Sequence, residues 1–191
     1  GNLLLDSNGR VSVQNYNNFN DYVKLGSVLP KYNLGWRNDF NIGNIGFGAM
    51  LAGRIGGVAI TMTQAALDHY GVSKESAEAR DAGGVNINGY RVPAQSYFEE
   101  RGKGRIAQYY TYSATNFRLQ EAYVSYRLPR KLVNDKIDVT LSIVGRNLAM
   151  LYSKAPFDPE AVSSTGNYAQ GLDYFMLPSL RSYGFSIKAN F

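Results

Sequence analysis

The sequence contains no cysteine, which excludes disulfide bonds and thiolate metal sites. Its single histidine, His69, has no second histidine or cysteine to share a metal ion with, and we expect it in a surface loop. Charged residues make up only 18% of the chain, below the roughly 25% of an average soluble domain. No stretch approaches the ~18 consecutive apolar residues of a membrane-spanning helix. A disulfide scaffold and a transmembrane helix are therefore not expected.

Tyrosine and glycine are abundant instead. The chain has 15 tyrosines, more than its 9 phenylalanines and 1 tryptophan together, and 20 glycines. Tyrosine suits a boundary between an apolar and a wet environment. The net charge of +5 is spread along the chain, and its densest basic group, RGKGR at 101–105, is typical of a solvated loop. We therefore expect no nucleic-acid partner.

Apolar and polar residues alternate with period two in five blocks, which predicts five long strands. In the first block, YNLGWRNDFNIG, the aromatic and aliphatic residues share one face. Gly43–Asn44 after it predicts a tight hairpin turn, and a phase change in the third block predicts a bulge near Gln120. The five strands are expected at about 32–42, 45–56, 116–128, 136–147 and 181–191.

The connections between these strands differ greatly in length. Gly43–Asn44 and 129–135 are short turns, whereas the segments at about 57–115 and 148–179 are long and should carry local structure. Capping and terminating residues predict short helices within 61–71, 73–84 and 93–102. Hairpins are expected from VNINGYRV, with Asn-Gly at its turn, and from NLLLD and RVSVQ near the start.

The strand pattern fits two fold classes. A soluble β-sandwich has alternating strands, but they are usually ~5–6 residues long. Strands of about 10–12 residues fit a tilted crossing of a bilayer, which needs ~9–11, with short periplasmic turns and long external loops. Five strands cannot close a membrane barrel, because bacterial barrels have at least 8 and an open edge in lipid is not tolerated. We therefore expect an all-β chain of antiparallel strands that is an incomplete part of a large transmembrane β-barrel.

Several segments are more specific than this pattern. They are FRLQEAYVSYRLPRKL, VTLSIVGRNLAMLY and GNYAQGLDYFMLPSLRSYGFS, with LGSVLPKYNLGWRNDFNIGNIGFGAMLAGRIGG upstream. Together they resemble the C-terminal region of the SusC/RagA family, the TonB-dependent outer-membrane transporters of Bacteroidetes. The resemblance implies that residues 1–191 are the C-terminal part of a plugged barrel that crosses the Gram-negative outer membrane many times.

The resemblance also implies a function. It suggests a nutrient importer for oligosaccharides or peptides, working with a SusD-like surface lipoprotein and energised by TonB through N-terminal regions that this sequence lacks. Such an importer binds its cargo and lets it pass through a gated channel without making or breaking covalent bonds, so no enzymatic activity is expected. The alternatives are a surface or secreted β-rich domain that binds glycans or partners, and a passive porin.

Two sets of residues are candidate functional sites. The resemblance implies that the barrel-assembly machinery recognises the final aromatic strand through Tyr183, Phe185, Ile187 and Phe191. Aromatic residues of the last long loop are candidate contacts with a ligand or with the lid lipoprotein, because tyrosine is enriched at interfaces. These are Tyr152, Phe157, Tyr168, Tyr174 and Phe175. The competing interpretation is that they pack loops together or form an outer aromatic belt.

Carboxylate pairs are the remaining candidates for chemistry. Glu99 and Glu100 are adjacent and point apart on a helix, and the sequence FDPE with Asp158 and Glu160 is more simply a proline-containing turn. Neither predicts a glycosidase pair. No cofactor is expected, although a Ca²⁺ site that uses Asp158, Glu160 or Asp173 stays as a hypothesis, because Ca²⁺ accepts several oxygen ligands from loops.

Overall fold

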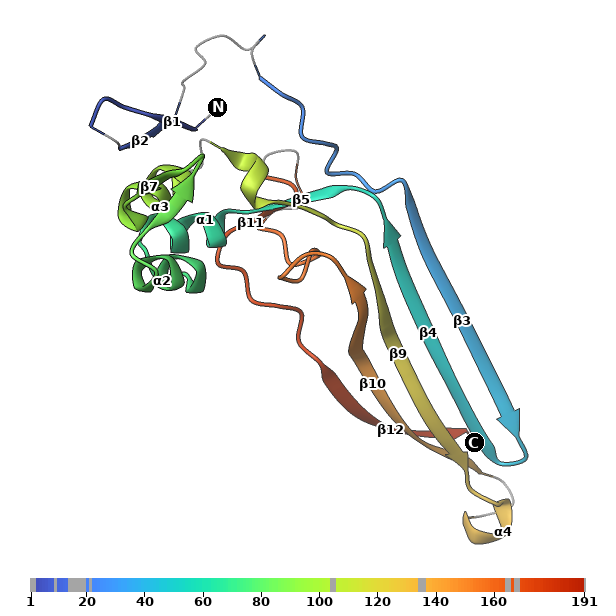
Figure 1. Ribbon diagram of the computed structural model, residues 1–191. Coiled ribbons are helices and arrows are strands. Elements are labelled where there is room, and N and C mark those ends of the chain that lie inside the picture. The colour runs from blue at the N-terminus through green and yellow to red at the C-terminus, as the bar shows by residue number, and fades with distance from the viewer. Residues whose placement is uncertain are drawn as a thin grey trace. The chain divides into compact units, whose positions relative to one another are not determined.

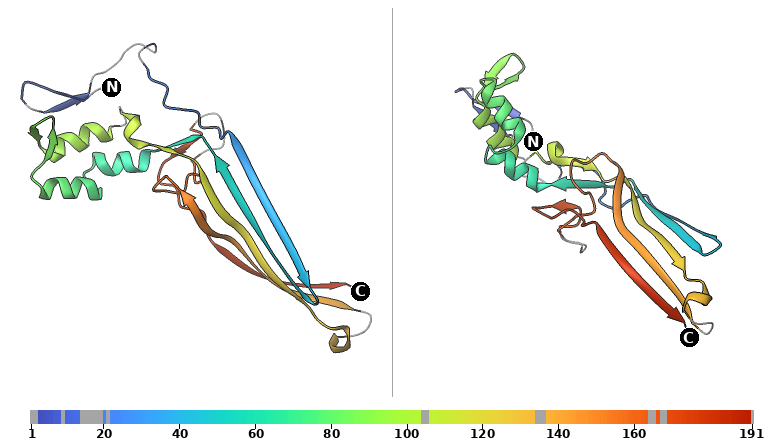
Figure 2. Two further views of the ribbon diagram at one scale, coloured as in Figure 1. Left: turned by 45° about the vertical axis from the view of Figure 1, so that its right-hand side comes forward. Right: turned by 90° about the horizontal axis from the view of Figure 1, so that it is seen from below.

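Five long antiparallel strands form one sheet in the computed structural model, which describes residues 3–8, 10–13, 20, 22–103, 106–133, 137–163, 166 and 169–190. The strand order is β12-β10-β9-β4-β3, and the strands lie side by side along their length (Figures 1 and 2). Their bounds are Tyr32–Ile42 for β3, Ile45–Ile55 for β4, Asn116–Arg127 for β9, Asp138–Ser153 for β10 and Ser182–Asn190 for β12. β3 and β12 are the edges of this sheet.

The chain divides into two compact units. The sheet unit comprises Leu29–Gly57, Ser113–Ala161 and Leu177–Phe191, and the loop unit comprises Gly1–Val28, Val58–Tyr112 and Val162–Met176. None of the helices in the described part of the chain is long and apolar enough to cross a membrane.

The hairpin and the bulge expected from the sequence are confirmed. Ile42 pairs directly with Ile45, and Gly43 between them has a φ of 59° that favours glycine. On β9, Glu121 pairs with Met50 and Leu119 with Leu51, so Gln120 is the extra residue of a bulge. The bulge keeps the apolar residues on either side of it on the same face of the sheet.

β10 extends further than the sequence predicts. The expected strand ends at residue 147, whereas the observed strand runs from Asp138 to Ser153. A second irregularity, between Arg146 and Ala149, shifts the alternation and hides the continuation. The turn expected at 129–135 contains a short helix, α4 (Arg130–Val133), and the terminal strand begins at Ser182 rather than at residue 181.

Glycines of β4 allow close side-chain packing on both faces of the sheet. A Cβ atom on Gly48 would lie 2.4 Å from Asp39 Oδ1 and 2.6 Å from Tyr123 Cε1, and one on Gly53 would lie 2.6 Å from the Phe117 ring. These positions therefore make room for bulky neighbours, as a glycine within a strand often does.

The loop unit contains the local structure expected between the long strands. Its helices are α1 (Met62–His69), α2 (Lys74–Asp81) and α3 (Ala94–Gly102), followed by the 3₁₀ helix η2 (Ala107–Tyr110). Its strands are β1 (Leu3–Leu5), β2 (Val11–Val13), β5 (Val58–Thr61), β6 (Val85–Ile87), β7 (Tyr90–Val92), β8 (Thr111–Ser113) and β11 (Leu172–Asp173). All three helices and both small hairpins were expected from the sequence.

The ends of these helices show why the sequence predicts them. The Ser73 hydroxyl accepts a hydrogen bond from the Ser76 N–H at the start of α2, and Thr61 does the same for Gln64 at the start of α1. Gly71 and Gly83 follow the ends of these helices with positive φ.

Candidate functional site

One face of the five-stranded sheet is apolar along almost its whole height. Directly paired residues share a face, so the register aligns these side chains in rows across the strands. One row contains Phe40, Phe47, Val124, Ile143 and Phe185, and the next contains Ile42, Ile45, Tyr126, Leu141 and Ile187. Most of these side chains are exposed. Such a continuous apolar surface is typical of a surface that contacts lipid or another protein.

Three residues of the proposed terminal signal lie on this apolar face. Tyr183, Phe185 and Ile187 of β12 point to the same side as their partners on β10 and are exposed. Phe191 lies outside the described residues. The alternation expected for the terminal strand is thus present, while its recognition by an assembly machinery stays a prediction.

The opposite face carries an ion-pair row at mid-height. Glu121 lies between two arginines, with 3.0 Å to Arg146 Nε and 3.7 Å to Arg37 Nη1. Arg37 also pairs with Asp39, which accepts a 2.7 Å hydrogen bond from the Tyr123 hydroxyl. These groups are partly exposed, and the row makes this face polar.

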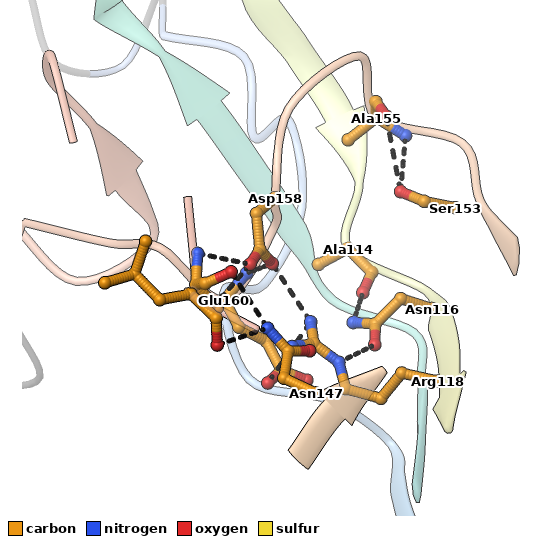
Figure 3. A network of polar contacts seen from close by, with 10 residues as sticks. Ala114, Asn116, Arg118, Asn147, Ser153, Ala155, Asp158 and Glu160 are labelled. Atoms are coloured by element: carbon orange, nitrogen blue, oxygen red, sulfur yellow. Dashed lines mark hydrogen bonds and ion pairs between the residues drawn. The ribbon is translucent and has the colours of Figure 1, made fainter. Parts of the chain in front are cut away.

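Higher on the polar face, the segment 154–161 contacts β9 through Asp158 and Glu160. We call this segment the shelf. The Arg118 guanidinium donates to Asp158 Oδ1 at 3.0 Å and lies 3.4 Å from Glu160 Oε2. Its side chain is only 4% exposed, whereas Arg146 on the same face is 69% exposed. Arg118 Nε also lies 3.4 Å from Asn116 Oδ1, so Asn116 supports the guanidinium from within β9 (Figure 3).

Asp158 is the centre of this cluster. Its Oδ2 accepts a 2.6 Å hydrogen bond from the Ser179 hydroxyl, and its Oδ1 accepts one from the Glu160 N–H at 3.1 Å. Burial opposes ionisation of the Asp158 carboxyl, but the hydrogen bonds from Ser179, Glu160 and Arg118 outweigh it and hold its pKa below the ordinary value. The carboxylate therefore stays charged at neutral pH.

The direction of this shift predicts how the cluster responds to pH. Because the folded-state pKa of Asp158 is below the unfolded value of about 3.9, its contribution to stability is present above that value and is lost as the pH falls through the lowered pKa. The difference in urea midpoint between the wild type and Asp158→Asn should be constant from pH 7 to 5 and shrink below about pH 4. A difference that already shrinks between pH 7 and 5 would contradict this assignment.

Asn147 holds the segment that leads into β12. Its φ of 52° is left-handed, at the irregularity of β10, and its side-chain amide donates to the carbonyl oxygens of Ser179 at 2.9 Å and Leu180 at 3.4 Å (Figure 3). The regular pairing of β10 with β12 ends at Arg146 and Ser182. Asn147 therefore satisfies backbone groups beyond the end of the ladder.

The structure places the candidate aromatic contacts in both units. In the sheet unit, Tyr152 lies on β10 with its ring 6.2 Å from that of Phe117, and Phe157 lies on the shelf. In the loop unit, Tyr174 and Phe175 form an edge-to-face pair at 5.1 Å and are 60% and 58% exposed. Tyr168 lies outside the described residues.

The exposed pair is held by well-defined contacts on its own unit. The Asp173 carboxylate accepts a 2.7 Å hydrogen bond from the Thr61 hydroxyl, and both residues are buried. The Phe175 N–H donates to the Thr63 hydroxyl at 2.6 Å, and Phe175 has a φ of 52°, which is rare for a bulky residue. Backbone strain of this kind is often found where a side chain is presented for function.

The carboxylates considered for chemistry have other partners. Asp158 and Glu160 face Arg118, and Asp173 accepts from Thr61. Within the described residues, no three His, Cys, Asp or Glu side chains gather as a metal site. His69 ends α1 rather than lying in a loop, and its Nδ1 is 3.2 Å from the Glu99 carbonyl oxygen.

A buried charge cluster in the loop unit was missed by the sequence analysis. Arg101, expected in a solvated loop, has a side chain only 10% exposed, and its Nε is 3.3 Å from Asp68 Oδ2, which is fully buried. The Tyr110 hydroxyl donates to the same carboxylate oxygen at 2.8 Å. Burial and this hydrogen bond raise the pKa of Tyr110. The guanidinium also lies 4.9–6.0 Å from the centres of four aromatic rings, Tyr97, Phe98, Tyr109 and Tyr110.

Comparison with known proteins agrees with this geometry. The chain is 25% identical over 194 residues to TonB-dependent receptor P3 of Formosa agariphila, a match that covers 98% of this chain. This similarity agrees with the resemblance of the sequence to the C-terminal region of the SusC/RagA family. Two structures of the RagAB peptide importer, in the open-open and closed-closed states, match 97% of the chain with TM-scores of 0.67 and 0.57 at 17% identity. No family model matches the chain.

These matches confirm the expected fold class. The chain is a mainly antiparallel β segment that corresponds to part of a TonB-dependent β-barrel, and the barrel is not closed within it. The chain spans 18% of the length of the receptor and 20% of the importer chain.

Proposed function

We propose that this chain forms part of the wall of an outer-membrane nutrient importer. The observation that carries the proposal is the sheet itself, with an exposed apolar face in aligned rows on one side and an ion-pair row on the other. This is the pattern of a membrane barrel whose apolar face contacts lipid and whose polar face lines the lumen. The similarity to a TonB-dependent receptor and to a peptide importer supports the same function.

The strand dimensions agree with this proposal. β3 and β4 have 11 residues each. At a rise of about 3.3 Å per residue and a tilt of about 45°, such a strand spans roughly 25 Å, the height of the apolar band of a membrane barrel. Short connections, at Gly43–Asn44 and around α4, lie at one end of the strands, which we assign to the periplasmic side. The long connections that follow β4 and β10 then leave from the external end of the strands.

Transport is proposed to need partners beyond this chain. The unpaired edges of β3 and β12 require further strands, because lipid offers no hydrogen bonds to an open edge. We propose that TonB supplies the energy through other parts of the protein and that a SusD-like lipoprotein covers the external face. Tyr174 and Phe175 are proposed contacts with that lipoprotein or with the cargo. Both are exposed, and the hydrogen bonds that Asp173 and Phe175 form with the segment 61–63 hold their backbone.

We propose a cargo class by analogy with the similar proteins. A peptide is favoured, because the similar solved structures are of a peptide importer. An oligosaccharide is the second candidate, since exposed tyrosine and phenylalanine rings also stack on sugars. Passage through a barrel involves no bond chemistry, so we propose no enzymatic activity and the function requires no cofactor.

Fractionation and uptake by the intact protein test the proposal. We expect it in the outer-membrane fraction, with a folded form that migrates faster on a detergent gel until it is boiled. Deletion of the gene should abolish growth on a peptide mixture or on one oligosaccharide, and loss of TonB should have the same effect. A protein that stays soluble without detergent would indicate a surface β-domain, and uptake that persists without TonB would indicate a passive porin.

A further inference from the structure

The shelf, residues 154–161, is the part of the sheet unit that covers the polar face. Its Pro159 side chain is fully buried. Arg118, which the shelf carboxylates bind, and Asn116, which accepts from Arg118, are almost fully buried as well. Lower on the same face, Arg37 and Arg146 are largely exposed. The covering is therefore confined to the upper part of the sheet.

Contacts on both sides of β10 hold the shelf. Toward β9, Asp158 and Glu160 bind the Arg118 guanidinium. Toward β12, Asp158 accepts from both the hydroxyl and the backbone N–H of Ser179, at 2.6 Å and 3.3 Å. The carboxylate of Asp158, which follows β10, therefore connects β9 with the segment that leads into β12.

The shelf is also ordered internally. The Glu160 N–H donates to Asp158 Oδ1, and the Ala161 N–H donates to the Asp158 carbonyl oxygen at 3.0 Å. At its start, the Ala155 N–H and the Ser153 hydroxyl oxygen form a 3.2 Å hydrogen bond. A segment that moved away would break the two ion pairs with Arg118 and the hydrogen bonds between Asp158 and Ser179 together.

We propose that the shelf is a fixed constriction at the external mouth of the barrel lumen, which stays in place during import and limits the size of the cargo. This rests on the proposed function, because it identifies the polar face with the lumen. The charged side chains of Lys154 and Glu160 are exposed on the shelf. The passage beside it therefore presents a charged, polar rim to the cargo rather than an apolar one.

Cysteine labelling tests this proposal without knowledge of the cargo. The chain has no native cysteine, so Asn116→Cys, introduced into the intact protein with any other reactive cysteine removed, reports on the covered surface. Its reaction with a membrane-impermeant maleimide should be at least tenfold slower than that of Lys154→Cys, the matched control on the exposed side of the shelf. Replacing residues 155–160 by a short Gly-Ser link should remove this protection. Equal rates at positions 116 and 154 in the intact protein would overturn the covering.

The same probe separates a fixed shelf from a moving gate. We expect the Asn116→Cys rate to agree within twofold between energised cells and cells that lack TonB, both in peptide-rich medium. A rate that rises tenfold with TonB would overturn the fixed position. In the Gly-Ser variant, peptides longer than the wild-type limit should be imported, and an unchanged limit would contradict the constriction. If the wild type imports nothing but position 116 is protected, the proposed function fails while the covering stands.

Discussion

Replacing Arg118 by methionine is expected to lower the free energy of unfolding of the barrel by about 3 kcal/mol. Removing one partner of a buried ion pair typically costs about 3–5 kcal/mol, because the remaining charge is left uncompensated. Asp158 keeps its hydrogen bonds from Ser179 and Glu160, so the lower end of this range applies. The measurement is the urea midpoint of the heat-modifiable folded form in lipid vesicles, combined with the slope of the transition.

Arg146→Met is the matched control. Arg146 lies on the same face and pairs with Glu121 at the same distance of 3.0 Å that joins Arg118 to Asp158, but it is exposed. An exposed pair contributes about 1 kcal/mol or less. A loss from Arg118→Met no larger than that from Arg146→Met would contradict the structural role of the cluster. In the Asp158→Asn background the effect of Arg118→Met should shrink, since the two residues act as a pair.

The strands and hairpins could be predicted because their signals are local. Gly43–Asn44 specifies a turn that needs positive φ, and the alternation around it gives the strand faces. The phase change at Gln120 is visible in the sequence and corresponds to the observed bulge. In the loop unit, Ser73 and Gly83 mark the ends of α2 in the same local way.

The shelf could not be predicted, because its contacts join distant parts of the sequence. The sequence FDPE predicts a turn, and the structure has one there, since the Asp158 carboxylate accepts a hydrogen bond from the Glu160 N–H. Nothing near it shows that Arg118 and Ser179 also converge on the carboxylate. The upper part of β10 was missed for a related reason, because the irregularity after Arg146 interrupts the period-two pattern.

The candidate aromatic residues were predicted by type rather than by position. Tyr174 and Phe175 are exposed, as a contact surface requires. The hydrogen bonds that hold this segment involve Thr61 and Thr63, more than 100 residues earlier in the chain, so the sequence around the two rings does not reveal them. Arg101 shows the opposite error. The composition of RGKGR suggests a solvent-exposed loop, whereas the fold buries the Arg101 side chain against Asp68.

Replacing Arg101 by methionine is expected to unfold the helical part of the loop unit while the sheet unit stays folded. Asp68 would remain fully buried with only the Tyr110 hydroxyl as partner, and one of its oxygens, Oδ1, already has no hydrogen bond. Loss of the counter-ion should cost about 3–5 kcal/mol, most of the stability of a small helical unit. Hydrogen exchange should therefore show α1 and α3 losing protection by at least a hundredfold, with β9 and β10 unchanged.

Two further variants separate the buried charge from general effects of lost charge. Lys74→Met removes an exposed pair with Glu78 on α2 and should change protection by less than about threefold. Arg101→Lys keeps the charge but loses the planar fork that reaches both Asp68 and Glu75, so an intermediate loss is expected. If Arg101→Met left α1 and α3 as protected as in the wild type, the cluster would not hold these helices together. Because Arg101 lies beside four aromatic rings, a loss equal for lysine and methionine would instead assign the stabilisation to guanidinium stacking.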